Sequence, residues 1–422
     1  MKKIEEYSKE ELVYLQNKLL RQYANFKNMN LNLDMSRGKP STEQLDQSNG
    51  IMNCLDDYKL ENGFDARNYG VLDGIPEAKR LFSDLVRIPS SNIIIGGNSS
   101  LNMMYDTMTR FMLFGSLGST PWCKLDKVKW LCPSPGYDRH FAITESMGIE
   151  MITIPMTVDG PDMDMVEKLV AEDASIKGMW CVPLYSNPQG ICYSDETIER
   201  LCSMKTAAPD FRIMWDNAYG VHDIYEKIRL KDVFVTAKIH HNEDRIMFFF
   251  STSKITFPGA GVALLAASDK NIKEVKKHMS KQTIGYDKLN QLRHVKYFKT
   301  ADGIRDHMQL LAKSLRPKFD VVLKTLEWEI GDCGIATWLE PKGGYFVSVD
   351  TLPGCAKATV ELCKEAGVII TPAGATYPYG NDPNDSNIRI APSYPTVEEL
   401  QLAMELFCLC IKLAGVAKLL EL

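Results

Sequence analysis

Four short polar segments each follow a run of apolar residues that is typical of a strand. They lie at residues 96–100, 187–190, 216–220 and 251–254, and they carry hydroxyl, amide, carboxylate and amine groups. Taken alone, each segment has a structural explanation, because turns, helix caps and surface lysines use the same residue types. Open α/β sheets, however, bind their ligands at the carboxyl ends of the strands. The common placement of the four segments therefore predicts one shared chemical site.

Four of these side chains meet the chemical needs of pyridoxal 5′-phosphate (PLP). The amine of Lys254 can form a Schiff base with the cofactor aldehyde, and the carboxylate of Asp216 can keep the pyridine nitrogen protonated. The amide of Asn187 and the phenol of Tyr219 can hydrogen-bond the phenolate oxygen of the ring and lower the pKa of the imine. The set predicts a PLP enzyme in which Lys254, Asp216 and Tyr219 are catalytic.

The elements that position these groups follow an alternating pattern. Helical segments such as 101–114 and 195–205 separate short β-like runs at 93–95, 128–132, 151–154, 178–182, 212–215, 246–251 and 262–266. This alternation predicts an α/β fold with a mixed or mostly parallel sheet covered by helices on both faces.

Other elements flank this region. An amphipathic helix is expected at 5–26 and a long helix at 300–326, followed by strands at 337–339, 344–349, 368–371 and 387–390 and a last helix at 396–420. We therefore expect an N-terminal helix and arm (1–48) that packs with the small domain, a large cofactor-binding domain (49–298) and a small α+β domain (299–422).

The composition excludes several classes of protein. With 422 residues, 45% of them hydrophobic and 24% charged, the chain is neither disordered, collagen-like nor a coiled coil. A net charge of -5 gives no electrostatic reason to bind nucleic acid or an anionic membrane. The longest apolar runs, such as those at 246–250 and 261–267, fall far short of a membrane span, and the N-terminus lacks the apolar segment of a signal peptide. The 11 cysteines lack the spacing of a zinc site, so we expect a cytoplasmic protein with reduced thiols and no metal.

The order and spacing of the four PLP-type residues resemble those of class I/II aminotransferases of PLP fold type I, from about residue 30 to the C-terminus. Residues 34–40 (DMSRGKP), 251–261 (STSKITFPGAG) and 287–292 (DKLNQL) resemble a bacterial subgroup of aspartate aminotransferases related to the aminotransferase domain of MocR-type regulators. Those regulators carry an N-terminal DNA-binding domain, for which about thirty residues leave no room, so the isolated enzyme is expected. The resemblance implies a mostly parallel sheet sandwiched by helices in the large domain, and a small α+β domain.

The resemblance also implies further cofactor-binding residues. Ser99 and Ser100 match the turn that binds the PLP phosphate, and Ser251 and Ser253 match the hydroxyls beside the lysine. Tyr137 matches the aromatic residue that stacks on the cofactor ring.

Substrate and subunit contacts follow from the same resemblance. Arg389 matches the arginine that binds the substrate α-carboxylate, with the backbone of Gly38 and the side chain of Asn187 beside it. Tyr69 matches the tyrosine that reaches the phosphate of the neighbouring subunit, which implies a homodimer with shared active sites.

One position departs from the pattern. Many class I/II aminotransferases have an arginine eight residues after the lysine, where it neutralises the phosphate, but this chain has Val262. Lys288 is the nearest later cation and is the candidate replacement, although a surface lysine in a first helical turn is the structural alternative.

The expected reaction is the ping-pong transfer of an amino group from L-aspartate to 2-oxoglutarate. A dicarboxylate donor needs a cation for its distal carboxylate, and Arg37, Arg139 and Lys39 are all candidates for that contact. The alternatives are an aminotransferase for another donor, such as alanine or an aromatic amino acid, a PLP-dependent C–S or C–C lyase, and a non-catalytic effector-binding module.

Overall fold

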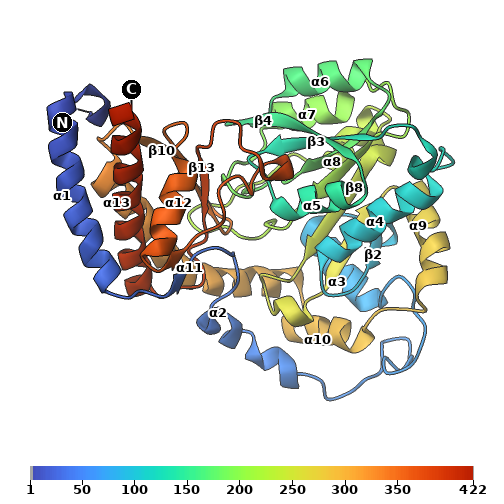
Figure 1. Cartoon of the computed structure of the whole chain (residues 1–422). Helices are drawn as coiled ribbons and strands as arrows, with labels where there is room; N and C mark the ends of the chain where they lie inside the picture. Colours follow the sequence, from blue (N-terminus) through green and yellow to red (C-terminus); the bar gives the residue numbers. More distant parts are fainter. Residues whose placement is uncertain (1–2, 422) are drawn as a thin grey trace.

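The computed structural model describes residues 3–421, and a large mixed sheet forms its centre (Figure 1). The sheet order is β2-β9-β8-β7-β6-β3-β4-β5. The strands are β2 (Ile93–Ile95), β3 (Lys129–Ser134), β4 (Glu150–Thr157), β5 (Gly160–Pro161), β6 (Ile176–Cys181), β7 (Arg212–Asp216), β8 (Ile246–Ser251) and β9 (Ala263–Ala267). Strands β4, β3, β6, β7 and β8 run parallel, whereas β9, β2 and β5 pair antiparallel. The predicted mixed, mostly parallel sheet is confirmed.

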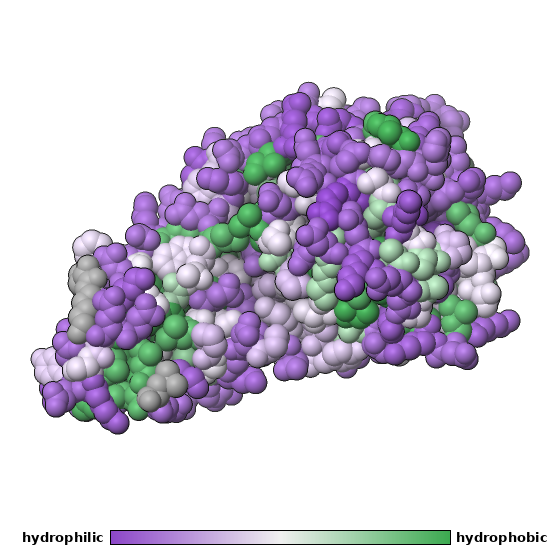
Figure 2. Space-filling view, turned by 90° about the horizontal axis from the view of Figure 1, so that it is seen from above, coloured by the Kyte–Doolittle hydropathy of each residue, from purple (hydrophilic) through white to green (hydrophobic). Residues whose placement is uncertain are grey.

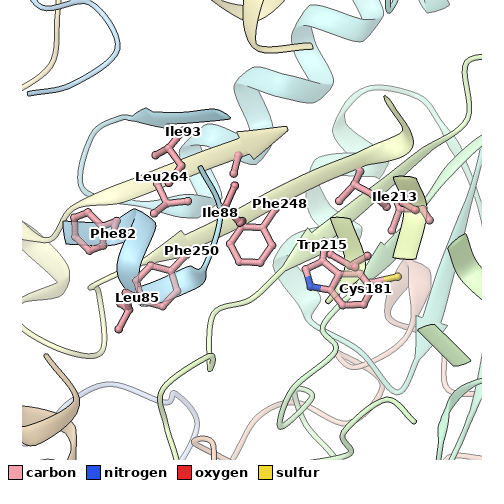
Figure 3. Close-up of a cluster of buried hydrophobic side chains, with 14 of the residues drawn as sticks. Phe82, Leu85, Ile88, Ile93, Cys181, Ile213, Trp215, Phe248, Phe250 and Leu264 are labelled. Atoms are coloured by element: carbon pink, nitrogen blue, oxygen red, sulfur yellow. The ribbon is translucent and has the colours of Figure 1, made fainter. Parts of the chain in front are cut away.

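Helices cover both faces of this sheet, which explains why β6, β7, β8 and β9 are buried along their whole length. One face packs on α3 (Pro76–Val86), α6 (Met163–Glu172), α7 (Asp195–Ser203) and α8 (Val233–Ile239). The other face packs on α4 (Ser100–Phe114), α5 (Asp138–Ser146) and α9 (Asp269–Gln282). Successive residues of β7 alternate between the two cores: Ile213 and Trp215 lie in the first, with Phe82 and Phe250 (Figure 3), and Met214 lies in the second.

A second, smaller region contains the C-terminal elements. Strands β10 (Ala336–Trp338), β11 (Val347–Thr351) and β13 (Asn387–Ile390) form an antiparallel sheet, and β1 (Leu33–Asp34) pairs in parallel with β12 (Val368–Ile369). Helices α1 (Lys9–Asn28), α12 (Ala356–Glu365) and α13 (Val397–Glu421) pack around them at the left of Figure 1. The short α2 (Thr42–Asp46) and α10 (Lys288–Phe298) lie along the lower edge of the molecule.

Helix α11 (Ala301–Ile330) joins the two regions. Its residues Met308 and Leu311 belong to a core of the large sheet, whereas Leu315 and Phe319 belong to the core of the smaller region. One continuous helix therefore contributes to both cores. The exact division of the chain at residues 48 and 298 stays a prediction.

Helix α13 is long and apolar enough, by length and composition, to cross a membrane, although its apolar runs are interrupted by single charged residues. In the fold, 72% of its most apolar 18-residue window is buried, and it packs against α1, α11 and α12. This burial is typical of the core helix of a folded domain. Figure 2 shows a mostly hydrophilic surface, with apolar side chains grouped at the left end, where α1 and α13 lie.

Candidate active site

The carboxyl ends of three adjacent parallel strands bring the predicted chemistry together. Asp216 is the last residue of β7, Lys254 follows the end of β8 at Ser251, and Asn187 follows β6. Strand β7 lies between β6 and β8 in the sheet, so these side chains leave the same edge side by side.

Asp216 has one carboxylate oxygen with a partner and one without. The side chain is 3% exposed, and its Oδ2 lies 3.0 Å from Nε2 of His140. Within residues 3–421, Oδ1 is buried and has no hydrogen-bond partner. A buried carboxylate oxygen without a partner is costly, so this oxygen fits an N–H donor from a bound molecule, such as the protonated nitrogen of a pyridine ring. The position of Asp216 therefore fits the protonated ring nitrogen of PLP.

His140 was not assigned a role from the sequence, although it lies one helical turn after Tyr137. Its ring stacks on Trp180 at 4.3 Å between centroids and 10° between planes, and the indole of Trp180 donates to Thr144 Oγ1 at 2.8 Å. This packing fixes the imidazole beside Asp216. The only sequence signal for His140 is that it follows Tyr137, the N-cap of α5, by three residues, which brings both side chains to the same side of the helix start.

The Lys254 amine lies among aromatic rings. Its Nζ is 5.1 Å from the ring centroid of Tyr219 and 5.8 Å from that of Tyr345. Burial lowers the pKa of Lys254, the charge of Asp216 opposes that shift, and the charge of Arg389 reinforces it. A lowered pKa makes the neutral amine more available, which suits a nucleophile and a base.

Burial also shifts the pKa values of two tyrosines and a histidine of this site. Burial raises the pKa of Tyr219 well above its usual value and raises the pKa of Tyr137 to about 12, so both phenols stay protonated donors. His222, which the sequence analysis missed, is 2% exposed and packs edge-on against Tyr219 and Tyr345. Burial lowers the pKa of His222 to about 3, which keeps it neutral beside Lys254.

Arg389 enters the site from β13 of the smaller sheet, where it pairs with Ser348. The residue is 6% exposed, and its guanidinium lies 4.9 Å from the ring centroid of Phe346. Nη1 donates to Asn187 Oδ1 at 3.3 Å, so the arginine and the strand-end amide meet across the two regions. Gly38 packs on the same ring: a Cβ at this position would lie 2.5 Å from Phe346 Cζ, which only a glycine avoids.

The four predicted serines also lie near one another. Ser99 is the N-cap of α4, and Ser100 is the first residue of that helix, whose N-terminal N–H groups are suited to an anion. Ser251 Oγ donates to Ser253 Oγ at 3.1 Å, and Ser253 Oγ donates to the carbonyl of Asn98 at 3.2 Å.

Lys288 is the first residue of α10, and it is buried rather than a surface lysine, with 7% exposure. Among residues 3–421 its ammonium forms no ion pair. The start of α10 packs on the loops that carry the serines: Asn290 Nδ2 donates to the carbonyls of Ala260 and Gly261 at 2.9 and 2.8 Å. A buried cation thus lies on the element next to the predicted phosphate site.

Other predicted residues are exposed rather than buried with this cluster. Tyr69 is 79% exposed, so most of its side chain faces away from its own chain. Arg37, Arg139 and Lys39 are all exposed, and Lys39 is already engaged, with Asp34 at 3.8 Å and the ring of Tyr394 at 3.9 Å.

A strand-end lysine beside a buried aspartate, on a mixed sheet with a smaller region alongside, is the arrangement of the PLP-dependent aminotransferases of fold type I. The model of the aspartate amino-transferase family matches residues 7–422, and this chain belongs to that family. It is therefore a transaminase, and the predicted fold class and family are confirmed.

Individual relatives are similar over nearly their whole length. The chain is 44% identical to an aspartate aminotransferase of Corynebacterium glutamicum, covering 98% of this chain and 96% of the relative. A protein of Mycolicibacterium smegmatis is 50% identical, with 95% of each chain covered. The crystal structure of an aspartate transaminase from Corynebacterium glutamicum superposes with a TM-score of 0.97 at 43% identity, covering 99% of each chain.

Proposed function

We propose that this chain is a PLP-dependent L-aspartate:2-oxoglutarate aminotransferase. The observation that carries the proposal is the buried Asp216 Oδ1, which lacks a partner within residues 3–421 and faces the same strand-end site as Lys254. The names of the relatives from Corynebacterium glutamicum support aspartate as the donor.

PLP, when bound, supplies an aldehyde that condenses with amines and a ring that withdraws electrons from the substrate Cα. Asp216, whose Oδ2 is paired with His140, would accept the N–H of the ring nitrogen through its free Oδ1 and hold that proton in place. Tyr219 and Asn187 would hydrogen-bond the phenolate oxygen of the ring, and Tyr137 would contact the ring. The amine of Lys254, whose pKa is lowered by burial, would act as the base at the substrate Cα and then return the proton as the acid.

Arg389 orients the substrate by its α-carboxylate. Its planar guanidinium is held over Phe346 and can bind a carboxylate with two parallel hydrogen bonds. The backbone of Gly38 approaches the same carboxylate, because no side chain separates it from Phe346. For the distal carboxylate, Arg37 and Arg139 are the better candidates, since within residues 3–421 neither forms an ion pair whereas Lys39 pairs with Asp34.

A donor screen tests the proposed specificity. Aspartate, alanine, phenylalanine and kynurenine would each be assayed with 2-oxoglutarate, and kcat/KM should be highest for aspartate. A higher kcat/KM for alanine or an aromatic donor would overturn aspartate as the substrate while leaving the transaminase intact.

We propose that Lys288 neutralises the cofactor phosphate in place of the missing arginine. Lys288→Met should then weaken PLP retention by about tenfold or more, because a buried phosphate dianion loses its cation. Retention would be measured by dialysis followed by cofactor absorbance. Lys281→Met, at an exposed lysine of α9, is the matched control. Equal retention in the two variants would mean that hydroxyls, backbone N–H groups and the helix dipole hold the phosphate alone.

We propose a homodimer in which Tyr69 serves the partner's phosphate. Its exposure of 79% is unusual for a tyrosine and supports a contact outside its own chain. Analytical ultracentrifugation should show a dimer. The Tyr69→Phe variant should retain PLP less well but should still be a dimer. A fully active monomer would contradict the shared site.

The 11 free cysteines support a reducing, cytoplasmic location.

A further inference from the structure

Asp138 forms an ion pair with Arg389 that the proposed reaction does not use. Its Oδ1 accepts a hydrogen bond from Arg389 Nη1 at 2.9 Å. The Arg389 side chain is 6% exposed and the Asp138 side chain 34%. Asp138 begins α5 on the large sheet and Arg389 lies in β13 of the smaller one, so the bond joins the two regions inside the site. The carboxylate of Asp138 is therefore bound to the Arg389 guanidinium, which is the group expected to bind the carboxylate of the substrate.

The donors of Arg389 leave little room for a second carboxylate. Nη1 donates to both Asp138 and Asn187, and Nε donates to Thr371 Oγ1 at 3.3 Å. Within residues 3–421 Nη2 has no hydrogen-bond partner. A bidentate carboxylate needs Nη2 together with either Nη1 or Nε. Each of those two nitrogens is engaged, so binding must displace a resident partner.

Both approaches bring the substrate against the charge of Asp138. An end-on carboxylate takes an N–H of Nη1 and competes there with Asp138 and Asn187. A side-on carboxylate displaces only the hydroxyl of Thr371. It then shares one guanidinium with the carboxylate of Asp138, and two negative charges bound to the same group repel each other. In either geometry the negative charge of Asp138 opposes the incoming carboxylate.

We propose that Asp138 is an internal substitute for the substrate carboxylate, which occupies Arg389 between turnovers and is displaced when substrate binds. This proposal rests on the proposed role of Arg389. Between turnovers the pair gives the nearly buried guanidinium a counter-ion, without which its burial would be costly. It therefore holds Arg389 in position at the expense of substrate affinity. Asp138 is in this sense a positioning residue that also sets KM.

Succinate binding to the holoenzyme, measured by isothermal titration calorimetry, tests the proposal without turnover. Succinate carries two carboxylates and no amino group. Asp138→Asn, which keeps the shape of the side chain, should lower the Kd for succinate about fivefold, because the competing charge is gone. Glu145→Gln removes the same charge at an exposed position of the same helix and should leave the Kd unchanged.

Two further measurements separate the outcomes. KM for aspartate and KM for 2-oxoglutarate should both fall in Asp138→Asn. If circular dichroism shows that this variant is poorly folded, Asp138→Ala is the second variant and should show the same increase in succinate affinity. An unchanged or raised Kd in folded variants, with binding lost in Arg389→Gln, would overturn the role of Asp138 alone. Succinate affinity retained in Arg389→Gln would overturn the proposed role of Arg389 itself.

Discussion

Replacing Lys254 with alanine should abolish transamination. Its amine is the group that joins the cofactor aldehyde and then moves the proton at the substrate Cα, and its pKa is lowered by burial for both tasks. The rate would be followed as oxaloacetate formed from aspartate and 2-oxoglutarate. Borohydride, which reduces a Schiff base to a stable bond, should no longer link the cofactor to the protein.

Lys281→Ala is the matched control for this variant, because Lys281 is an exposed lysine in the last turn of α9. It should keep normal turnover and borohydride labelling. Normal turnover in Lys254→Ala would show that the cofactor is held by another residue or that the reaction needs no lysine.

Asp216→Ala should lower kcat by about a thousandfold or more, since roughly 4 kcal/mol of transition-state stabilisation is lost with the proton on the ring nitrogen. Without that proton the ring is a poor electron acceptor. The measurement is the single-turnover rate with aspartate at saturating cofactor, so that weaker PLP binding does not enter.

His140→Asn separates the role of the carboxylate from that of its support. The variant leaves Asp216 in place but removes the imidazole ring that stacks on Trp180. Its kcat should therefore fall less than the kcat of Asp216→Ala. A loss below about tenfold in Asp216→Ala, roughly 1.4 kcal/mol, would contradict the assigned role of the aspartate.

The large sheet and its strand-end residues could be predicted because the strands are buried on both faces. The central strands are short, mostly apolar runs, and the polar residues at their ends stand out, as Asp216 does at the end of β7. The predicted strands at 93–95, 212–215, 246–251 and 387–390 agree with the structure to within one residue. The predicted strand at 344–349 is displaced, because β11 begins at Val347 after a glycine turn.

Contacts between distant segments could not be predicted from local patterns. The pairing of His140 with Asp216 depends on how α5 packs against β7, and Asp138 meets Arg389 across 251 positions of the chain. The two-residue strands β1, β5 and β12 are too short to show alternation. Helix α11 gives no local sign that it serves two cores, because its apolar stripe continues through both.

A single-turnover experiment with the holoenzyme and L-aspartate alone tests the proposed transamination most directly. The aldehyde absorbance of the cofactor should disappear as one equivalent of oxaloacetate forms, with pyridoxamine phosphate left on the enzyme, and 2-oxoglutarate should restore the spectrum. Release of ammonia or carbon dioxide with an unchanged cofactor would indicate a lyase, and a spectrum that does not respond to aspartate or to any other amino acid would indicate a binding module. Either result would contradict the aminotransferase reaction proposed for this site.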